Sequence, residues 1–208
     1  MEFLNVIFKL LNTNSEFPKY QLERKVDIFI NVFLEDLLTS YFNDGCKVQY
    51  ICPEFPFKKD GNRQSTNVDY LCSRELGSNK EIIFIELKTD KRSFDASQLE
   101  IYMKNKDWKV LNDNITELGK SKKYKGKYET LMNRINEQHF QNHAKIRILY
   151  ISPIQVISKI VASGNSVDES NIKSLAELLL LTKSFPSEAA LFEKFVKDWD
   201  LGVFEINN

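Results

Sequence analysis

A nearly continuous apolar run at residues 81–88, with the sequence EIIFIELK, constrains the fold of this chain more than any other segment. Such runs are typical of a central β-strand that is buried on both faces of a sheet. The run ends in two charged residues, Glu86 and Lys88, where a buried strand would normally remain apolar. We therefore expect the end of this strand to carry function.

The segments before this strand predict a helix followed by a β-meander. Residues 21–42 contain neither Gly nor Pro and repeat apolar side chains at helical spacing, and residues 43–45 then supply a helix stop. Short polar turns separate three β-rich runs, so we expect the strands to pair antiparallel. These runs are residues 47–57, 68–74 and 81–88.

Helical patterns return after the third strand. Residues 93–106 predict a helix with Ser93 or Asp95 as its cap. A charged helical stretch follows at 108–139, interrupted near 119–126, and the apolar run 144–153 then predicts another buried strand. The predicted order is helix, three strands, helix, strand, which is an α/β class with a mixed sheet flanked by helices.

The chain length and the last third of the sequence predict one domain. A chain of 208 residues suits a single core. Beyond Pro153 the sequence contains an apolar fragment at 155–163, two helical patterns and a closing edge-strand pattern at 202–206. The helical patterns cover residues 172–182 and 187–199. We expect a single domain over 1–208, with a core at about 21–153 and a mostly helical extension at 154–208.

Composition bounds the class of protein. Basic and acidic residues number 29 each, whereas a protein with standing affinity for nucleic acid is usually strongly basic. An enzyme needs only a locally basic face and transient contact with its substrate. The sequence shows no signal leader and no apolar stretch near the roughly 20 residues that span a bilayer. We therefore expect a cytoplasmic protein that does not associate with membranes.

Cysteine and histidine offer little chemistry. The three cysteines form no CxxC pair, so we expect buried, reduced thiols and no zinc or iron–sulfur site. His139 and His143 are four residues apart and could share a helix face. No HExxH pattern or third ligand accompanies them, which favours surface or capping roles over a metal pair.

Carboxylates and a lysine at the strand ends form a more specific pattern. Glu86 and Lys88 are two residues apart on a strand and so share one face. An antiparallel turn can bring Asp69, on the preceding strand, beside Glu86. Two neighbouring carboxylates repel and need a cation, and oxygen ligands suit Mg²⁺, with Mn²⁺ as a substitute. Lys88 could then orient or help deprotonate an attacking water.

These residues resemble the PD-(D/E)XK nuclease superfamily, which has the restriction-endonuclease-like fold. Asp69 and the Glu86-Leu87-Lys88 tripeptide carry the resemblance, with Val68 where the family usually has proline. The segment ELKTDKRSFDASQLEIY is similar to the RecB-like branch, whose glutamine and tyrosine would be Gln98 and Tyr102. The resemblance covers about residues 21–153. It implies an αβββαβ core and a Mg²⁺-dependent deoxyribonuclease, in which Gln98 and Tyr102 help to position substrate or the lysine.

Many members of this superfamily add a glutamate from the first helix as a further metal ligand. The candidates here are Glu23, Glu35 and Asp36. At about 100° per residue, Glu23 falls near the core-facing stripe of this helix, while Glu35 points away from it. The resemblance therefore favours Glu23, with Glu35 as the alternative.

Other interpretations of these residues remain open. The Asp69, Glu86 and Lys88 group could be a salt-bridge cluster at strand ends, with Gln98 and Tyr102 as ordinary helix residues. The same fold could also serve as a catalytically silent nucleic-acid-binding or protein-interaction module. Expected partners are DNA, or RNA, and either a partner protein or a second copy of the chain. Lysines between Lys91 and Lys109, and the stretch 120–128, could contact phosphates or simply be solvated surface.

Overall fold

The computed structural model describes seven stretches of the chain, which belong to two compact units. The described residues are 2–15, 22–58, 65–88, 95–120, 125–141, 144–152 and 172–200. Unit 1 comprises Met1–Asn43, Leu87–Phe94 and Tyr150–Asn208, and unit 2 comprises Asp44–Glu86 and Asp95–Leu149. Each unit is therefore assembled from segments that are far apart in the sequence. The predicted single domain, with its core at 21–153, stays a prediction.

The strands form a mixed sheet with the hydrogen-bonded order β1-β2-β3-β4-β5. Strand β1 pairs antiparallel with β2, β2 pairs antiparallel with β3, and β4 pairs parallel with β5. The Ile82 amide donates to the Lys145 carbonyl and the Lys88 amide to the Ile151 carbonyl, each at 2.8 Å. Strands β3 and β4 therefore run parallel. The strand bounds are Lys47–Lys58, Ser65–Leu76, Asn79–Leu87, Ile146–Ile151 and Ile172–Lys173.

These strands confirm the α/β class and the mixed sheet. Each strand predicted before residue 153 is present, and the central strand β3 is buried from Ile82 to its end, as its apolar sequence indicated. The predicted antiparallel meander of β1, β2 and β3 is also confirmed. The restriction-endonuclease-like core itself stays a proposal.

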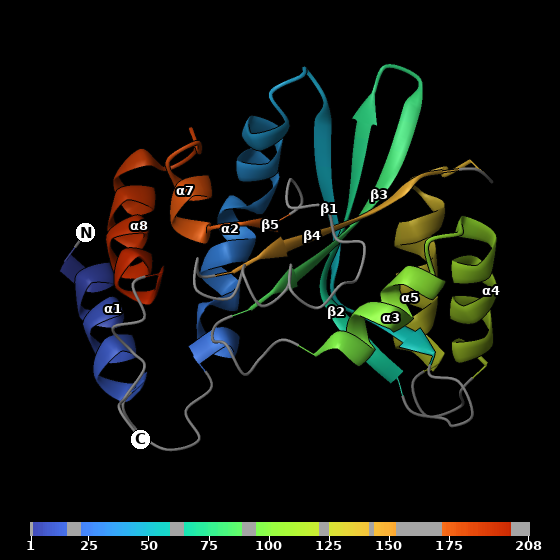
Figure 1. Ribbon diagram of the computed structural model, residues 1–208, viewed down its shortest axis with the longest axis horizontal. Helices are drawn as coiled ribbons and strands as arrows, with labels where there is room; N and C mark the ends of the chain where they lie inside the picture. Colours follow the sequence, from blue (N-terminus) through green and yellow to red (C-terminus); the bar gives the residue numbers. More distant parts are fainter. Residues whose placement is uncertain are drawn as a thin grey trace. The chain divides into compact units, whose positions relative to one another are not determined.

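Three helices of unit 2 follow β3 and lie close to one another in Figure 1, and two of them, α4 and α5, contact β1. They are α3 (Ala96–Lys104), α4 (Trp108–Leu118) and α5 (Lys125–Asn136). Asp95, one of the two predicted caps, caps α3 by accepting a hydrogen bond from the Ser97 amide at 2.8 Å, while Ser93 lies outside the described residues. The Arg134 guanidinium donates to the Ile51 carbonyl at 2.9 Å and joins α5 to β1.

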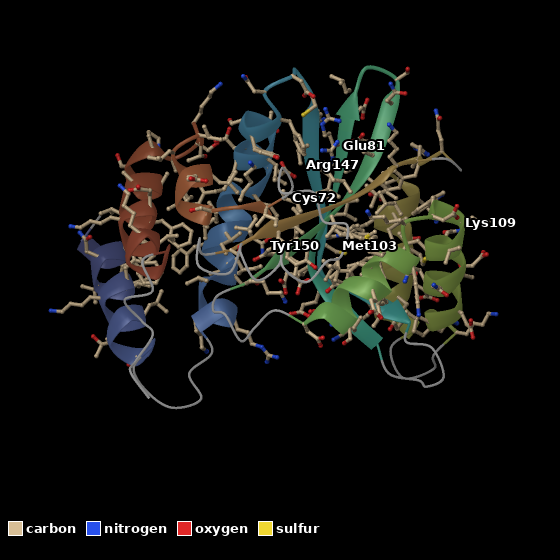
Figure 2. All side chains as sticks on the ribbon, viewed as in Figure 1. Cys72, Glu81, Met103, Lys109, Arg147 and Tyr150 are labelled. Carbon is tan, nitrogen blue, oxygen red and sulfur yellow. The ribbon has the colours of Figure 1, made fainter. Side chains whose placement is uncertain are left out.

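A buried arginine ties β2 to β3 in unit 2. Arg74 is 8% exposed, and its guanidinium forms ion pairs with Glu81, at 2.8 Å, and with Asp44. Arg147 approaches the same Glu81 carboxylate at 3.6 Å, and both side chains can be followed in Figure 2. Because burying a guanidinium without partners is costly, these carboxylates stabilise the buried Arg74, and Glu81 links β3 to it.

The helices of unit 1 enclose a cluster of phenylalanines. Phe192 stacks on Phe8 with ring centroids 5.6 Å apart and lies 5.7 Å from Phe29 and 6.2 Å from Phe33. Phe195 extends the cluster at 5.2 Å from Phe8. The helices are α1 (Glu2–Ser15), α2 (Leu22–Phe42), α7 (Leu175–Leu179) and α8 (Pro186–Asp200), seen side by side in Figure 1.

Two elements of unit 1 differ from the expected pattern. Helix α1 was not predicted, although Phe8 and Leu11 are buried on one side of it. Residues 172–173 form strand β5 and not the start of a helix, because they pair with Tyr150 and Ile151 of β4. The expected helices 21–42 and 187–199 are confirmed as α2 and α8. The fragments expected at 155–163 and 202–206 lie outside the described residues.

The three cysteines are buried and unpaired, as the sequence predicted. Burial raises the pKa of the Cys52 thiol to about 12, so this thiol stays protonated at neutral pH. Among the residues that the structure describes, no helix combines the length and hydropathy required to cross a bilayer.

One carboxylate of α2 fastens the turn between α7 and α8. Asp36 Oδ2 accepts hydrogen bonds from the Thr182 hydroxyl at 2.5 Å, the Lys183 amide at 2.6 Å and the Ser184 amide at 2.7 Å. Burial by itself would raise the pKa of the Asp36 carboxyl, but these hydrogen bonds outweigh burial and lower the pKa below its ordinary 3.8. The ionised form of Asp36 therefore stabilises the folded state.

We predict that Asp36→Ala lowers the free energy of unfolding by about 1–3 kcal/mol, because three donors lose a charged acceptor. In the unmodified protein, this contribution is complete above the unfolded-state pKa, near 3.8. It is lost as the pH falls through the lower pKa of the folded state. Urea unfolding at pH 7 and at pH 3 would measure both effects.

Asp113→Ala, at an exposed carboxylate of α4, is the control and should leave stability within about 0.5 kcal/mol. Equal stability of the Asp36 variant and the unmodified protein at pH 7 would contradict the assignment.

Candidate active site

The two predicted carboxylates lie on neighbouring strands of unit 2. Glu86 is near the end of β3 and only 2% exposed, while Asp69 is partly buried on β2. The register pairs Tyr70 with Ile85. Continued by one residue, it places Asp69 opposite Glu86. Opposite residues of an antiparallel pair project from the same face of the sheet. The arrangement agrees with the strand pairing that the sequence analysis required of these two residues.

Helix α3 places Tyr102 against the end of β3. The Tyr102 hydroxyl lies 2.7 Å from Glu86 Oε2 and 2.8 Å from the main-chain carbonyl oxygen of Asn67. Its ring is fully buried, with centroids 5.1 Å from Phe57 and 6.5 Å from Phe84. This packing fixes the ring, so the hydroxyl is held at the carboxylate.

Gln98 joins the same group from one helical turn earlier. Its side-chain amide donates to the Asn67 carbonyl at 3.2 Å, the same oxygen that the Tyr102 hydroxyl approaches. Residues four apart on a helix lie on one face, which explains how both side chains reach one atom. Glu86, Tyr102, Gln98 and Asn67 thus form one hydrogen-bonded group, in which a single phenolic hydrogen serves a carboxylate and a carbonyl.

Asn67 is the member of this group that the sequence analysis missed. Its side-chain NH₂ donates to Glu54 Oε2 of β1 at 3.0 Å. Its Oδ1 is buried and has no hydrogen-bond partner among the residues that the structure describes. Glu54 has a φ of 48°, an uncommon backbone conformation for a residue other than glycine. The only sequence signal was the position of Asn67, two residues before Asp69 on the same strand.

The remaining predicted residues belong to unit 1. Lys88 is 6% exposed, and its amide donates to the Ile151 carbonyl at 2.8 Å. Glu23 lies in α2, and its side chain is outside the described residues. Of its two alternatives, Glu35 is exposed on α2, whereas the Asp36 carboxylate accepts hydrogen bonds from the turn before α8.

The side-chain oxygens of Asp69, Glu86 and Asn67 are ligand atoms of the type that hard divalent cations prefer. Asp69 and Glu86 supply carboxylate oxygens and Asn67 supplies an amide oxygen, a set that fits Mg²⁺ or Mn²⁺. Within the described residues, no three His, Cys, Asp or Glu side chains gather closely enough to hold a metal ion. His139 is exposed after α5, and His143 lies outside the described part of the chain.

Comparisons of the chain with protein-family models, with curated proteins and with solved structures gave no match.

We predict that Tyr102→Phe lowers the free energy of unfolding by about 1–2 kcal/mol, because Glu86 Oε2 and the Asn67 carbonyl lose a shared donor. The matched control is Tyr128→Phe, which removes the hydroxyl of a partly exposed tyrosine in α5 and should have little effect. Chemical denaturation of both variants provides the comparison. Equal effects in the two variants would mean that the Tyr102 hydroxyl does not support the group.

Proposed function

We propose that this protein is a metal-dependent nuclease that hydrolyses DNA phosphodiester bonds through Asp69, Glu86 and Lys88. The observation that supports this proposal most is the contact between Tyr102 and Glu86, at 2.7 Å. The family resemblance assigned a carboxylate on a strand, Glu86, and a tyrosine on the next helix, Tyr102, to the same active site. An accidental motif match gives no reason for these two side chains to meet.

In the proposed site, Asp69 and Glu86 hold a divalent cation between two strands. A bound Mg²⁺ would supply charge neutralisation for the transition state and lower the pKa of a coordinated water. The protein residues do the positioning. The buried surroundings of Glu86 strengthen its attraction for a cation, because little water competes with the ligand.

The residues of α3 keep the acidic side chains in place. Tyr102 fixes one oxygen of Glu86, and Gln98 holds the main chain of β2 two residues before Asp69. Lys88 follows Glu86 in the order that the ExK motif requires, and its ammonium group would orient the attacking water or the scissile phosphate. Each role concerns position or charge, as phosphodiester hydrolysis requires.

DNA contact would use lysines of unit 2. Lys104, Lys106 and Lys109 are exposed at the end of α3 and the start of α4. Their charges would give a protein of zero net charge a locally basic surface for the phosphates of the substrate. RNA would meet the same phosphate contacts and is the alternative polymer. The lysines at 91 and at 122–123 lie outside the described residues.

A catalytically silent binding module is the second candidate. The observation that favours it is the Tyr102 hydroxyl on Glu86 Oε2, because this contact already provides the buried carboxylate with a partner. The lack of three acidic, histidine or cysteine ligands in close reach, among the described residues, points the same way. Binding of DNA without cleavage would be the signature of this function.

We predict that the purified protein cleaves linear, nicked or single-stranded DNA in Mg²⁺ or Mn²⁺ and that EDTA stops cleavage. Asp69→Ala and Glu86→Ala should lower the rate at least about 100-fold, since each removes a ligand of the cation that would neutralise charge in the transition state. Gel assays of product formation measure this effect. Glu100→Gln, at an exposed residue of α3, is the control and should retain the rate of the unmodified protein.

Two outcomes would contradict this proposal. Binding without cleavage under every metal and substrate tested would favour the silent module. Cleavage by Glu86→Ala at the unmodified rate would show that the chemistry lies elsewhere in the chain.

We further predict that metal binding and turnover separate at Lys88. Isothermal titration with Mn²⁺ should show affinity at least about tenfold weaker in Asp69→Ala and Glu86→Ala, because each loses a ligand. Lys88→Ala should bind Mn²⁺ with unchanged or higher affinity, since a nearby positive charge is removed. Its cleavage rate should nevertheless fall at least about 100-fold. Weaker Mn²⁺ binding by Lys88→Ala would assign this residue to structure and not to the reaction.

A further inference from the structure

Asn67 lies where the hydrogen bonds of the candidate site converge. Its main-chain carbonyl accepts from Gln98 at 3.2 Å and lies 2.8 Å from the Tyr102 hydroxyl. That hydroxyl is in turn 2.7 Å from Glu86 Oε2. One phenolic oxygen therefore separates the main chain of Asn67 from the Glu86 carboxylate, and both residues belong to unit 2.

The orientation of the Asn67 side chain is set by Glu54. A carboxylate only accepts hydrogen bonds, so the NH₂ end of the amide must be the end that faces Glu54 Oε2, at 3.0 Å. The opposite end, Oδ1, is buried without a hydrogen-bond partner among the described residues. Exchange of the two amide ends would place two acceptors against each other and lose this bond.

A buried carbonyl oxygen without a partner is unfavourable. Native proteins rarely leave such an acceptor unsatisfied unless a ligand, an ion or a water completes the site. Asn67 and Asp69 are two residues apart on β2, so their side chains project from one face of the strand. The unsatisfied oxygen thus belongs to the strand face that carries the Asp69 carboxylate.

We infer that Asn67 Oδ1 is a third protein oxygen ligand for the divalent cation, beside Asp69 and Glu86. This inference rests on the proposed function. An amide oxygen is a neutral, hard donor and is among the ligand types that Mg²⁺, Mn²⁺ and Ca²⁺ accept. It completes a set that acidic side chains alone do not supply within the described residues. Glu54 then serves as a positioning residue, since it holds the amide with its oxygen toward the cation.

The test is isothermal titration of the full chain with Mn²⁺ in four forms of the protein. The Mn²⁺ affinity of Asn67→Ala should be at least about tenfold lower, because a ligand is lost. Glu54→Ala keeps the oxygen but frees the amide, so its affinity should fall by a smaller factor. Asn133→Ala, at an exposed asparagine of α5, should bind as the unmodified protein does. Thermal melting of each variant shows whether it is folded.

A fifth form guards against loss of folding in Asn67→Ala. In the double variant Glu54→Gln with Asn67→Asp, the introduced amide can donate to the introduced carboxylate, which restores the hydrogen bond with donor and acceptor exchanged. The variant also places an ionised oxygen at position 67. We expect it to bind Mn²⁺ at least as tightly as the unmodified protein, while each single change alone does not. Tighter binding by the double variant would thus support coordination by the side chain at position 67.

The outcomes distinguish this inference from the function on which it rests. If the unmodified protein binds Mn²⁺ and cleaves DNA, but folded Asn67→Ala binds Mn²⁺ equally well, the Asn67 assignment is wrong and the nuclease proposal stands. Loss of Mn²⁺ affinity in the folded double variant, to the level of Asn67→Ala, also overturns the assignment. If the unmodified protein binds no Mn²⁺, the proposed function and this inference both fail.

Discussion

The burial of Glu86 is the constraint around which unit 2 is arranged. A carboxylate that is 2% exposed at the end of an apolar strand loses its hydration and must be compensated by protein groups or by a cation. The Tyr102 hydroxyl provides such a group at 2.7 Å. For the Tyr102 hydroxyl to reach the Glu86 carboxylate, α3 starts after its Asp95 cap, and the Tyr102 ring packs on Phe57 and Phe84. One desolvated side chain thus sets the position of a helix.

A second consequence concerns β2. Gln98 and Tyr102 both meet the main-chain carbonyl of Asn67, so α3 is fastened to β2 as well as to β3. Asp69, two residues further along β2, is thereby held beside the strand that carries Glu86. Gln98 and Tyr102 provide this support through an amide and a hydroxyl group, and only the hydroxyl contacts a carboxylate directly, at Glu86.

The sequence predicted features that depend on local pattern and missed those that depend on distant partners. The continuous apolar run identified β3, and the family resemblance singled out Gln98 and Tyr102, whose spacing puts them on one helix face. Helix α1 was missed although its apolar residues share one broad helical face. Phe8 of this face is buried, whereas Phe3, Val6 and Leu10 are more than half exposed. The short strand β5 and the contacts of Asn67 arise only from the folded arrangement, so no window of the sequence reports them.

The Asp36 hydrogen bonds have a consequence for the order in which the protein is made. Asp36 and Thr182 are 146 residues apart, and the ring of Phe8 likewise packs on Phe192, near the other end of the chain. On the ribosome, α1 and α2 emerge long before α8 is translated. Unit 2, in contrast, is fully translated once Leu149 has been added, before α8 begins at Pro186. Unit 1 therefore cannot be completed before α8 has been translated. A nascent chain must keep the phenylalanines of its first helices from aggregating until then, and a truncated product would leave them without their cover.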